Sequence, residues 1–328
     1  MAFRVGLIGL GMAVTPHAKS LIDLKDRAQV AYAFSPSAER RSKFAERFPF
    51  PQCDRLETIL ADRTVGAVLV LTPPNTHLEI VERCAAAGKH VLLEKPLEIT
   101  TERAERLVNA ARKVKLGVVL QHRFRPAAEK LREQLPKLGQ LVSASAAIPN
   151  WRPQSYYDQP GRGTKARDGG GVLLTQAIHT LDLFLSFTGE PVDVKGFAAT
   201  TPVHRMETED LAVAALRFAN GALGVVHATT AAYPGFPERI ELVGTRGTAV
   251  LEGTSLRMQL LDEPPFEFRT DAGGGGTGAD PMAFPHDWHR GVLADFLDAI
   301  EHDRQPRVNG AEALKVHRVI DRILRSAG

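Results

Sequence analysis

A glutamate, a lysine and a proline stand together at residues 94–96, directly after the apolar run at residues 90–93. Such a run predicts a buried strand, and ligands bind beyond the carboxyl ends of parallel strands. Partial burial there lowers the pKa of an amine toward neutrality, which would let Lys95 act as an acid or base. We expect Glu94 to hold Lys95 in place and a cis bond at Pro96 to fix its direction. A surface ion pair between Glu94 and Lys95 is the alternative.

A second chemical signal is the glycine-rich turn in the segment VGLIGLGMAVTPHA, where the first apolar run ends and a helix begins. Glycines at this point let backbone N–H groups approach a pyrophosphate, and the helix N-terminus stabilises the anion. The third glycine of the dinucleotide fingerprint is replaced by Val14. We expect the cofactor to contact Gly9, Gly11, Met12 and Ala13. A plain strand–turn–helix is the alternative.

The end of the second predicted strand favours NADP over NAD. No carboxylate stands there to bind ribose hydroxyls, and the segment reads Phe-Ser-Pro-Ser at residues 34–37. Ser35 and Arg40 are expected to bind a 2′-phosphate, because a guanidinium is the natural partner of that group. The alternative is that Arg40 and Arg41 only form the solvated face of a helix.

The first part of the chain alternates strand and helix patterns, which predicts a doubly wound parallel sheet of the Rossmann type in residues 1–121. Its strands are expected at residues 3–10, 29–34, 65–71, 90–93 and 117–121. Its helices are expected at residues 16–24, 37–48, 77–87 and 100–114.

Residues 122–328 have an α+β pattern with a meandering sheet. Strands are expected at residues 141–147, 211–218, 222–230 and 239–244, the last three antiparallel. Helices are expected at residues 127–134, 172–187, 288–301 and 311–325. The glycine-rich segment 271–280 is predicted to be mobile, and the closing helices are expected to pack back on the first domain.

Composition argues against several other functions. The formal net charge is +3 over 328 residues, with no basic run interleaved with aromatic residues, so nucleic acid is not an expected partner. No stretch has the pattern of a membrane span or a signal peptide. Cys53 and Cys84 form no CxxC motif, which fits a reducing cytoplasm. His286 and His289 have no zinc-ligand partners at a persuasive spacing, so no metal is expected.

Four stretches together resemble the Gfo/Idh/MocA family of oxidoreductases, the relatives of glucose–fructose oxidoreductase and inositol dehydrogenase. They are GLIGLGMA, TPPNTHLEIVERCAAAGKHVLLEKPL, QHRFRP and DGGGVLLTQAIHTLDL. The resemblance extends over nearly the whole chain. It implies a Rossmann-like domain followed by a domain with an open, mainly antiparallel sheet. It also implies a homodimer or homotetramer formed through that sheet.

The resemblance implies a role for particular residues. Lys95 matches the catalytic lysine beside the nicotinamide, with Glu94 near the cofactor, and His179 is implied as its partner in proton transfer. The loop that lies against the cofactor contains Thr72, Pro73 and Asn75. His77 matches a further family position and is expected to cap the next helix.

The predicted helix over residues 172–187 places Thr175, His179 and Asp182 on one face. Many relatives carry Asp where Thr175 stands, so the resemblance leaves proton transfer to Lys95 and His179. A branch of the family acting on sugars and nucleotide sugars has an amide at that position, and this chain looks closer to it. Asp182 is expected to orient other groups. A satisfied helix histidine is the alternative for His179.

The loop at residues 150–167 is the predicted specificity region, because aromatic faces stack on sugar rings and arginine binds phosphate or carboxylate. Candidate substrate residues are His122, Arg123, Trp151, Tyr156, Arg162, Asp168 and Thr175. For Arg123 a structural ion pair is the alternative, and for the loop an ordinary ordered surface. Relatives often have Trp where Gly161 stands, so their substrates do not transfer to this chain.

The resulting hypothesis is an NAD(P)-dependent oxidoreductase that moves a hydride between nicotinamide and a secondary alcohol or ketone of a sugar, sugar derivative or cyclitol. The family also suggests a redox-assisted glycosidase or eliminase with tightly held NAD. A third possibility is a non-catalytic dinucleotide-binding regulator, against which the intact Lys95 and His179 argue.

Overall fold

The computed structural model describes residues 2–270 and 285–328, so the predicted mobile segment 271–280 lies outside the described residues. The chain divides into two compact units. One contains residues 1–121 and 286–314, and the other contains residues 122–285 and 315–328. The sequence analysis assigned residues 122–328 to the second domain and expected the closing helices to pack back on the first. In the structure residues 286–314 belong to the first unit. Helix α12 (Gly310–Ala327) contributes to both units.

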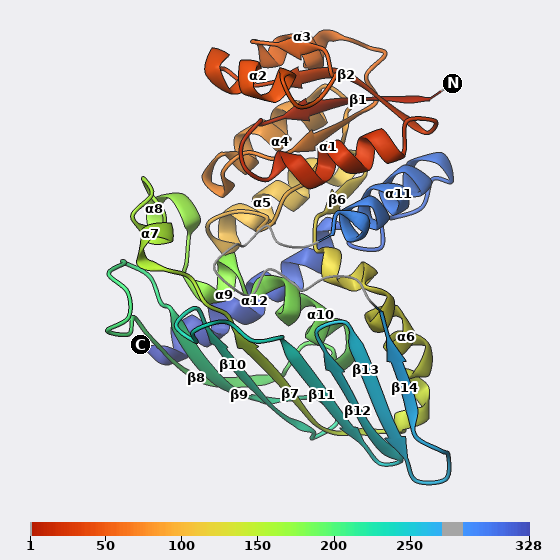
Figure 1. The fold of residues 1–328 in the computed structure, drawn as a ribbon, viewed down its shortest axis with the longest axis vertical. Coiled ribbons are helices and arrows are strands. Elements are labelled where there is room, and N and C mark those ends of the chain that lie inside the picture. The colour runs from red at the N-terminus through yellow and green to blue at the C-terminus, as the bar shows by residue number, and fades with distance from the viewer. Residues whose placement is uncertain (1, 271–284) are drawn as a thin grey trace. The chain divides into compact units, whose positions relative to one another are not determined.

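The first unit is built on a six-stranded parallel sheet, as the sequence predicts, with the strand order β3-β2-β1-β4-β5-β6 (Figure 1). Leu7, Leu69 and Leu92 of its central strands are fully buried, because helices cover both faces. The strands are β1 (Phe3–Ile8), β2 (Ala28–Phe34), β3 (Gln52–Cys53), β4 (Ala67–Val70), β5 (His90–Leu93) and β6 (Leu116–Val118).

Helices α1 and α11 of this unit pack on one another, as do α4 and α5, and right-handed crossovers place α1 and α4 on opposite faces of the sheet. The helices are α1 (Val14–Asp23), α2 (Ala38–Ala45), α3 (Leu56–Ala61), α4 (His77–Ala86), α5 (Thr101–Ala110) and α11 (Asp287–Glu301). The sequence analysis missed β3 and α3, which are too short to show a periodic pattern.

The second unit is built on an eight-stranded sheet in the order β14-β13-β12-β11-β7-β10-β9-β8 (Figure 1). Its strands are β7 (Leu141–Pro149), β8 (Asp193–Ala199), β9 (Leu211–Arg217), β10 (Leu223–Thr229), β11 (Arg239–Gly244), β12 (Gly247–Glu252), β13 (Ser255–Leu260) and β14 (Phe266–Arg269). The sheet is mainly antiparallel, as predicted. Strand β10, however, is antiparallel only to β9 and runs parallel to β7 on its other side.

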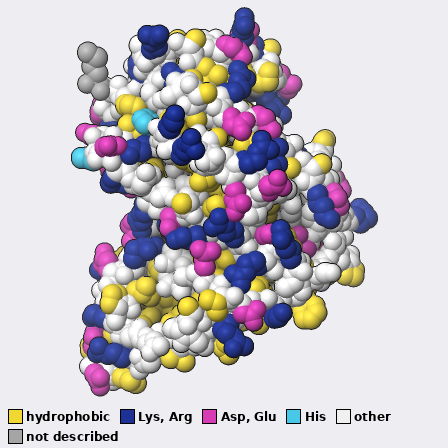
Figure 2. Space-filling view, turned by 180° about the vertical axis from the view of Figure 1, so that it is seen from behind, with side chains coloured by type: hydrophobic (Ala, Val, Ile, Leu, Met, Phe, Trp, Pro, Cys, Tyr) yellow, Lys and Arg dark blue, Asp and Glu magenta, His cyan; other side chains and the backbone are white. Residues whose placement is uncertain are grey.

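One face of this sheet is covered and the other is open. Helix α10 packs against β7, and α6 packs against β12 and β13. The helices of the unit are α6 (Pro126–Gln134), α7 (Gln154–Tyr157), α8 (Lys165–Asp168), α9 (Val172–Thr175) and α10 (Ile178–Thr188). On the surface drawn in Figure 2, positive and negative side chains are interspersed.

The prediction of one continuous helix over residues 172–187 is wrong. This segment is divided into two helices, α9 and α10. The N–H of Ala177 bonds to the carbonyl of Val172 at 2.8 Å, five residues back, which interrupts the regular ladder. Thr175 therefore ends α9, while His179 and Asp182 lie on α10. The three side chains do not share one helix face.

Candidate active site

The glycine turn between β1 and α1 has the features that a dinucleotide needs. Gly9 has a φ of +103°, and a Cβ there would lie 2.9 Å from the backbone of Leu71, so only glycine fits. A Cβ at Gly11 would meet nothing within 4 Å, which leaves open space beside the turn. Helix α1 has no side-chain cap at Ala13 and no acidic residue in its first turn. Its N-terminus thus fits an anion such as a pyrophosphate.

The end of β2 presents a different arrangement from the one expected. Ser35 is only 2 % exposed, and its hydroxyl accepts a hydrogen bond from the N–H of Ser37 at 3.3 Å. Arg41 donates to the carbonyl of Ser35 at 2.6 Å. Arg40, at the start of α2, is exposed and makes no side-chain ion pair within the described part of the chain. The Ser35 hydroxyl and the Arg41 guanidinium are therefore engaged within the chain, whereas Arg40 is exposed.

Both oxygens of the Glu94 carboxylate are occupied at the end of β5. His17 donates from Nε2 to Oε1 at 2.8 Å, and the backbone N–H of Lys95 donates to Oε2 at 3.0 Å. Burial is the largest influence and by itself raises the pKa of Glu94, but the hydrogen bond from His17 and the neighbouring His17, His289 and Lys95 together outweigh it and leave that pKa lowered. The Lys95–Pro96 bond is cis, as the sequence predicts. A buried Glu94 held by His17 does not match the alternative of a surface ion pair.

His77 joins the two loops that flank this strand end. Its Nδ1 lies 3.0 Å from the carbonyl oxygen of Pro96, and its Nε2 lies 2.9 Å from that of Thr72. Burial lowers the pKa of this imidazole. The capping role expected for His77 belongs instead to Glu98, which accepts from the N–H of Leu78 at 3.2 Å. Thr72 lies against Gly9, and Pro73 and Asn75 are exposed beyond it.

In the second unit, His179 stands in the first turn of α10 and is half-buried. Its ring centroid lies 4.9 Å from that of His122, with the planes tilted by 30°. His122 is buried and is hydrogen-bonded to Arg125 at Nε2. Arg125 in turn pairs with Glu238 at 3.2 Å. His122 is therefore a buried neighbour of the His179 ring, with its Nε2 engaged by Arg125.

Arg123 forms a buried, bidentate ion pair with Asp182. Its Nε lies 2.7 Å from Oδ2, and its Nη2 lies 2.6 Å from Oδ1. Of the two roles considered for Arg123, this geometry matches the structural ion pair. Asp182 holds the segment 121–124 against α10 and so helps to fix the helix that carries His179.

The predicted specificity loop brings some of its candidate residues together. Arg162 lies over the ring of Tyr156 at 4.7 Å and donates from Nη1 to its hydroxyl at 2.9 Å. The amide of Gln176 lies 3.5 Å from the same hydroxyl, which links the loop to the end of α9. Thr175 bonds to its neighbour Gln176 and to the carbonyl of Gly171.

The other two candidate residues of the loop have structural contacts. Asp168 is buried and accepts from the N–H of Gly163 at 2.9 Å, which closes the turn before α8. Trp151 stacks edge-on against Tyr233, with centroids 5.4 Å apart.

Three site residues escaped the sequence analysis. His17 and His289 come together with Glu94 although 77 residues separate His17 from Glu94, and Glu238 pairs with Arg125 across 113 residues. No spacing within the sequence could have indicated these contacts, because they depend on which elements meet in the fold.

Two family models match the chain. Residues 3–122 match the oxidoreductase family with an NAD-binding Rossmann fold, and residues 129–250 match the GFO/IDH/MocA C-terminal domain. Within the described residues, no single helix has the length and apolar composition to cross a membrane. The bent pair 165–175 and 178–188 meets those two criteria together.

Known proteins resemble the chain over most of its length. Myo-inositol 2-dehydrogenase of Thermotoga maritima is 32% identical over 74% of this chain and 73% of its own. Inositol 2-dehydrogenase of Rhizobium meliloti is 26% identical over 99% and 97%. Among solved structures, the WlbA dehydrogenase from Bordetella pertussis, in complex with NADH and UDP-GlcNAcA, has a TM-score of 0.83. It is 27% identical and covers 100% of this chain and 97% of that one.

Proposed function

The chain belongs to the Gfo/Idh/MocA family of NAD-binding oxidoreductases, and from that premise we propose the residues that carry its reaction. A secondary hydroxyl of a sugar, sugar derivative or cyclitol loses its proton to Lys95, and His179 exchanges that proton. Reduction of the ketone runs in reverse. The observation that carries this proposal is Lys95 at the carboxyl end of β5, held by Glu94, on the sheet whose first turn fits a pyrophosphate.

Nicotinamide, when bound, supplies the acceptor or donor of the hydride. The residues fit such a cofactor: the turn at Gly9 and Gly11 leaves room for its pyrophosphate, and the N-terminus of α1 faces that room. The side chains of the chain then orient the substrate and move its proton. Lys95 is the base in oxidation and the acid in reduction.

The first test is Lys95→Ala. We expect kcat to fall by about a hundredfold or more, since general acid–base catalysis contributes that much, while the Kd for the dinucleotide changes little. Steady-state kinetics on a panel of sugars and cyclitols, with fluorescence titration of the cofactor, measure both. Lys113→Ala, at an exposed position, is the matched control. Full turnover in Lys95→Ala would contradict the assignment.

The same assay separates the two other functions of such a chain. A redox-assisted glycosidase or eliminase would keep its dinucleotide bound and turn over with no net change in nicotinamide absorbance. A regulator would bind dinucleotide and show no turnover on any substrate. The presence of both Lys95 and His179 favours the oxidoreductase.

We propose that the substrate meets the loop at residues 150–167 through Tyr156 and Arg162. A tyrosine face and a guanidinium lie together there, and they suit a sugar ring and its oxygens. Inositol dehydrogenases and a dehydrogenase bound to a nucleotide sugar are among the similar proteins, which supports a sugar-like substrate.

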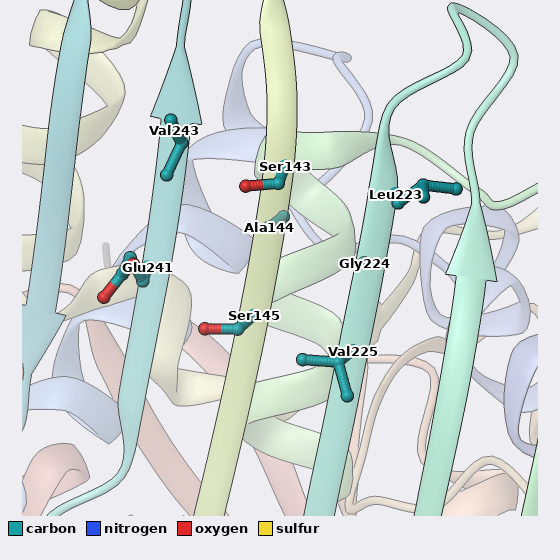
Figure 3. A pocket seen from close by; sticks show the side chains of 8 residues that line it. All are labelled: Ser143, Ala144, Ser145, Leu223, Gly224, Val225, Glu241 and Val243. Carbon is teal, nitrogen blue, oxygen red and sulfur yellow. The ribbon is translucent and has the colours of Figure 1, made fainter.

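We also propose that a second copy of the chain covers the open face of the eight-stranded sheet. Phe197 is 78 % exposed and Leu223 is 58 % exposed on this face. A shallow hollow of about 270 Å³ lies on the same sheet. Figure 3 shows the side chains of β7, β10 and β11 that line it. Exposed apolar patches of this kind mark protein interfaces.

We further propose a cytoplasmic location. The two free cysteines support a reducing compartment of this kind.

A further inference from the structure

Three ionisable side chains from separate elements meet inside the first unit. His17 lies on α1, Glu94 follows β5, and His289 lies on α11. Their exposed fractions are 1 %, 9 % and 3 %. Groups of this kind are rarely buried without a reason, because burial disfavours charge and leaves polar atoms in need of partners.

Among the described residues, Glu94 is the polar partner that holds the ring of His17. The Nε2 of His17 donates to Glu94 at 2.8 Å, and its Nδ1 has no hydrogen-bond partner within the described residues. Glu94 is fixed in turn at its own backbone, where its N–H bonds to the carbonyl of Val70 at 2.8 Å. One oxygen of the carboxylate thus faces α1, and the other holds the backbone N–H of Lys95.

His289 closes this cluster from the side of α11. Its ring meets that of His17 edge-on, with centroids 5.1 Å apart and planes at 87°. Burial lowers the pKa of His289 to about 3, so this ring stays neutral at working pH. Asp23 of α1 also joins the two helices, because it accepts hydrogen bonds from His286 at 2.8 Å and Arg290 at 2.9 Å.

We propose that His17 is a positioning residue for the reaction at Lys95 and acts through Glu94. The inference rests on the proposed role of Lys95. When His17 donates to Glu94, the carboxylate is directed toward α1 and the backbone of Lys95. Without that donor, a buried carboxylate needs a different partner, and a cation is the strongest one. The ammonium of Lys95 is adjacent in the chain, and pairing with it would keep Lys95 protonated.

The same three side chains could be considered as a metal site, because their ligand atoms lie within 4.8 Å of one another. The hydrogen bond between His17 and Glu94 already joins a nitrogen and an oxygen that such an ion would need. The second oxygen of Glu94 accepts a hydrogen bond from the backbone N–H of Lys95. The cluster therefore fits a hydrogen-bonded support better than a metal centre, and Zn²⁺ binding is an outcome that the test can detect.

The test compares His17→Leu with His17→Gln. Leucine fills space but donates no hydrogen bond, whereas the glutamine amide can donate to Glu94. In His17→Leu we expect kcat for alcohol oxidation to fall about tenfold or more. The acidic limb of the kcat profile should move about one pH unit higher, because Lys95 holds its proton longer. In His17→Gln, kcat and the acidic limb of its pH profile should stay close to the wild-type values. Ser20→Ala, buried on the same helix, is the control.

The Kd for the dinucleotide and the thermal unfolding midpoint are measured for every variant. Equal losses in His17→Leu and His17→Gln, or an unmoved pH profile, would overturn the inference. If His17→Leu does not fold, His17→Asn, whose amide is too short to reach Glu94, takes its place. Stoichiometric Zn²⁺ bound by the wild type and lost in His17→Gln would also overturn it. If Lys95→Ala retains turnover, the proposed function fails first, whatever the His17 variants do.

Discussion

At the end of β2, residues of a Rossmann-type sheet contact the adenosine ribose of a dinucleotide. Ser35, named from the sequence as a phosphate ligand, is buried and already bonded to Ser37. Arg41 is engaged with the carbonyl of Ser35, which leaves Arg40 exposed at the start of α2. We therefore propose that the chain prefers NADP and that Arg40 binds its 2′-phosphate, because no carboxylate stands there to repel that group.

We predict that Arg40→Ala weakens NADPH binding about tenfold, the value of one charge-assisted hydrogen bond, and leaves NADH binding unchanged. Fluorescence titration of both cofactors measures this difference. Arg63→Ala, an exposed arginine on the same unit, should change neither Kd. Equal weakening of both cofactors would show that Arg40 does not read the 2′-phosphate.

At the scale of elements, short segments are fixed by buried ion pairs. Arg123 and Asp182 join the turn at residues 121–124 to α10, and Arg125, the next residue, pairs with Glu238 just before β11. A bidentate pair fixes direction as well as distance. The break between α9 and α10 makes this anchoring necessary, because α9 cannot align α10 through a continuous helix.

We predict that Asp182→Asn lowers the free energy of unfolding by about 3 kcal/mol, because it leaves the charge of Arg123 buried with a weaker partner. Urea unfolding followed by circular dichroism gives the change. The double variant Arg123→Met with Asp182→Leu should recover much of the loss. If Asp182→Asn has the same midpoint of urea unfolding as the wild type, the ion pair does not stabilise the unit.

At the scale of the whole molecule, one face of the eight-stranded sheet has no covering layer of helices among the described residues. Phe197 stands opposite Val213, which stands opposite His227, so exposed side chains of β8, β9 and β10 form one row. A second copy presenting the same face would cover these rows by two-fold symmetry. The proposed oligomer follows from this face.

We predict that Phe197→Asp shifts the protein to a smaller species in sedimentation velocity, because a buried carboxylate in the interface has no partner. Leu261→Asp, at a leucine that is equally exposed but lies after β13, should leave the mass unchanged. An unchanged mass in Phe197→Asp would place the interface elsewhere or leave the chain a monomer.

The sequence alone determined the fold class and the position of Lys95. Apolar strands alternate with helical patterns over residues 1–121, and both signals are local, because a strand or helix shows its periodicity within a few residues. The glycine turn and the cis bond at Pro96 were also predicted, since tight turns depend on residue type.

Only the tertiary structure determined which side chains contact one another in the site. His17 and His289 lie beside Glu94 because α1 and α11 pack together, and Arg123 reaches Asp182 because the turn at residues 121–124 lies against α10. The parallel pairing of β10 with β7 and the break after Thr175 were missed as well. These features depend on contacts between residues far apart in the chain, and on backbone hydrogen bonds, neither of which leaves a pattern in the order of the amino acids.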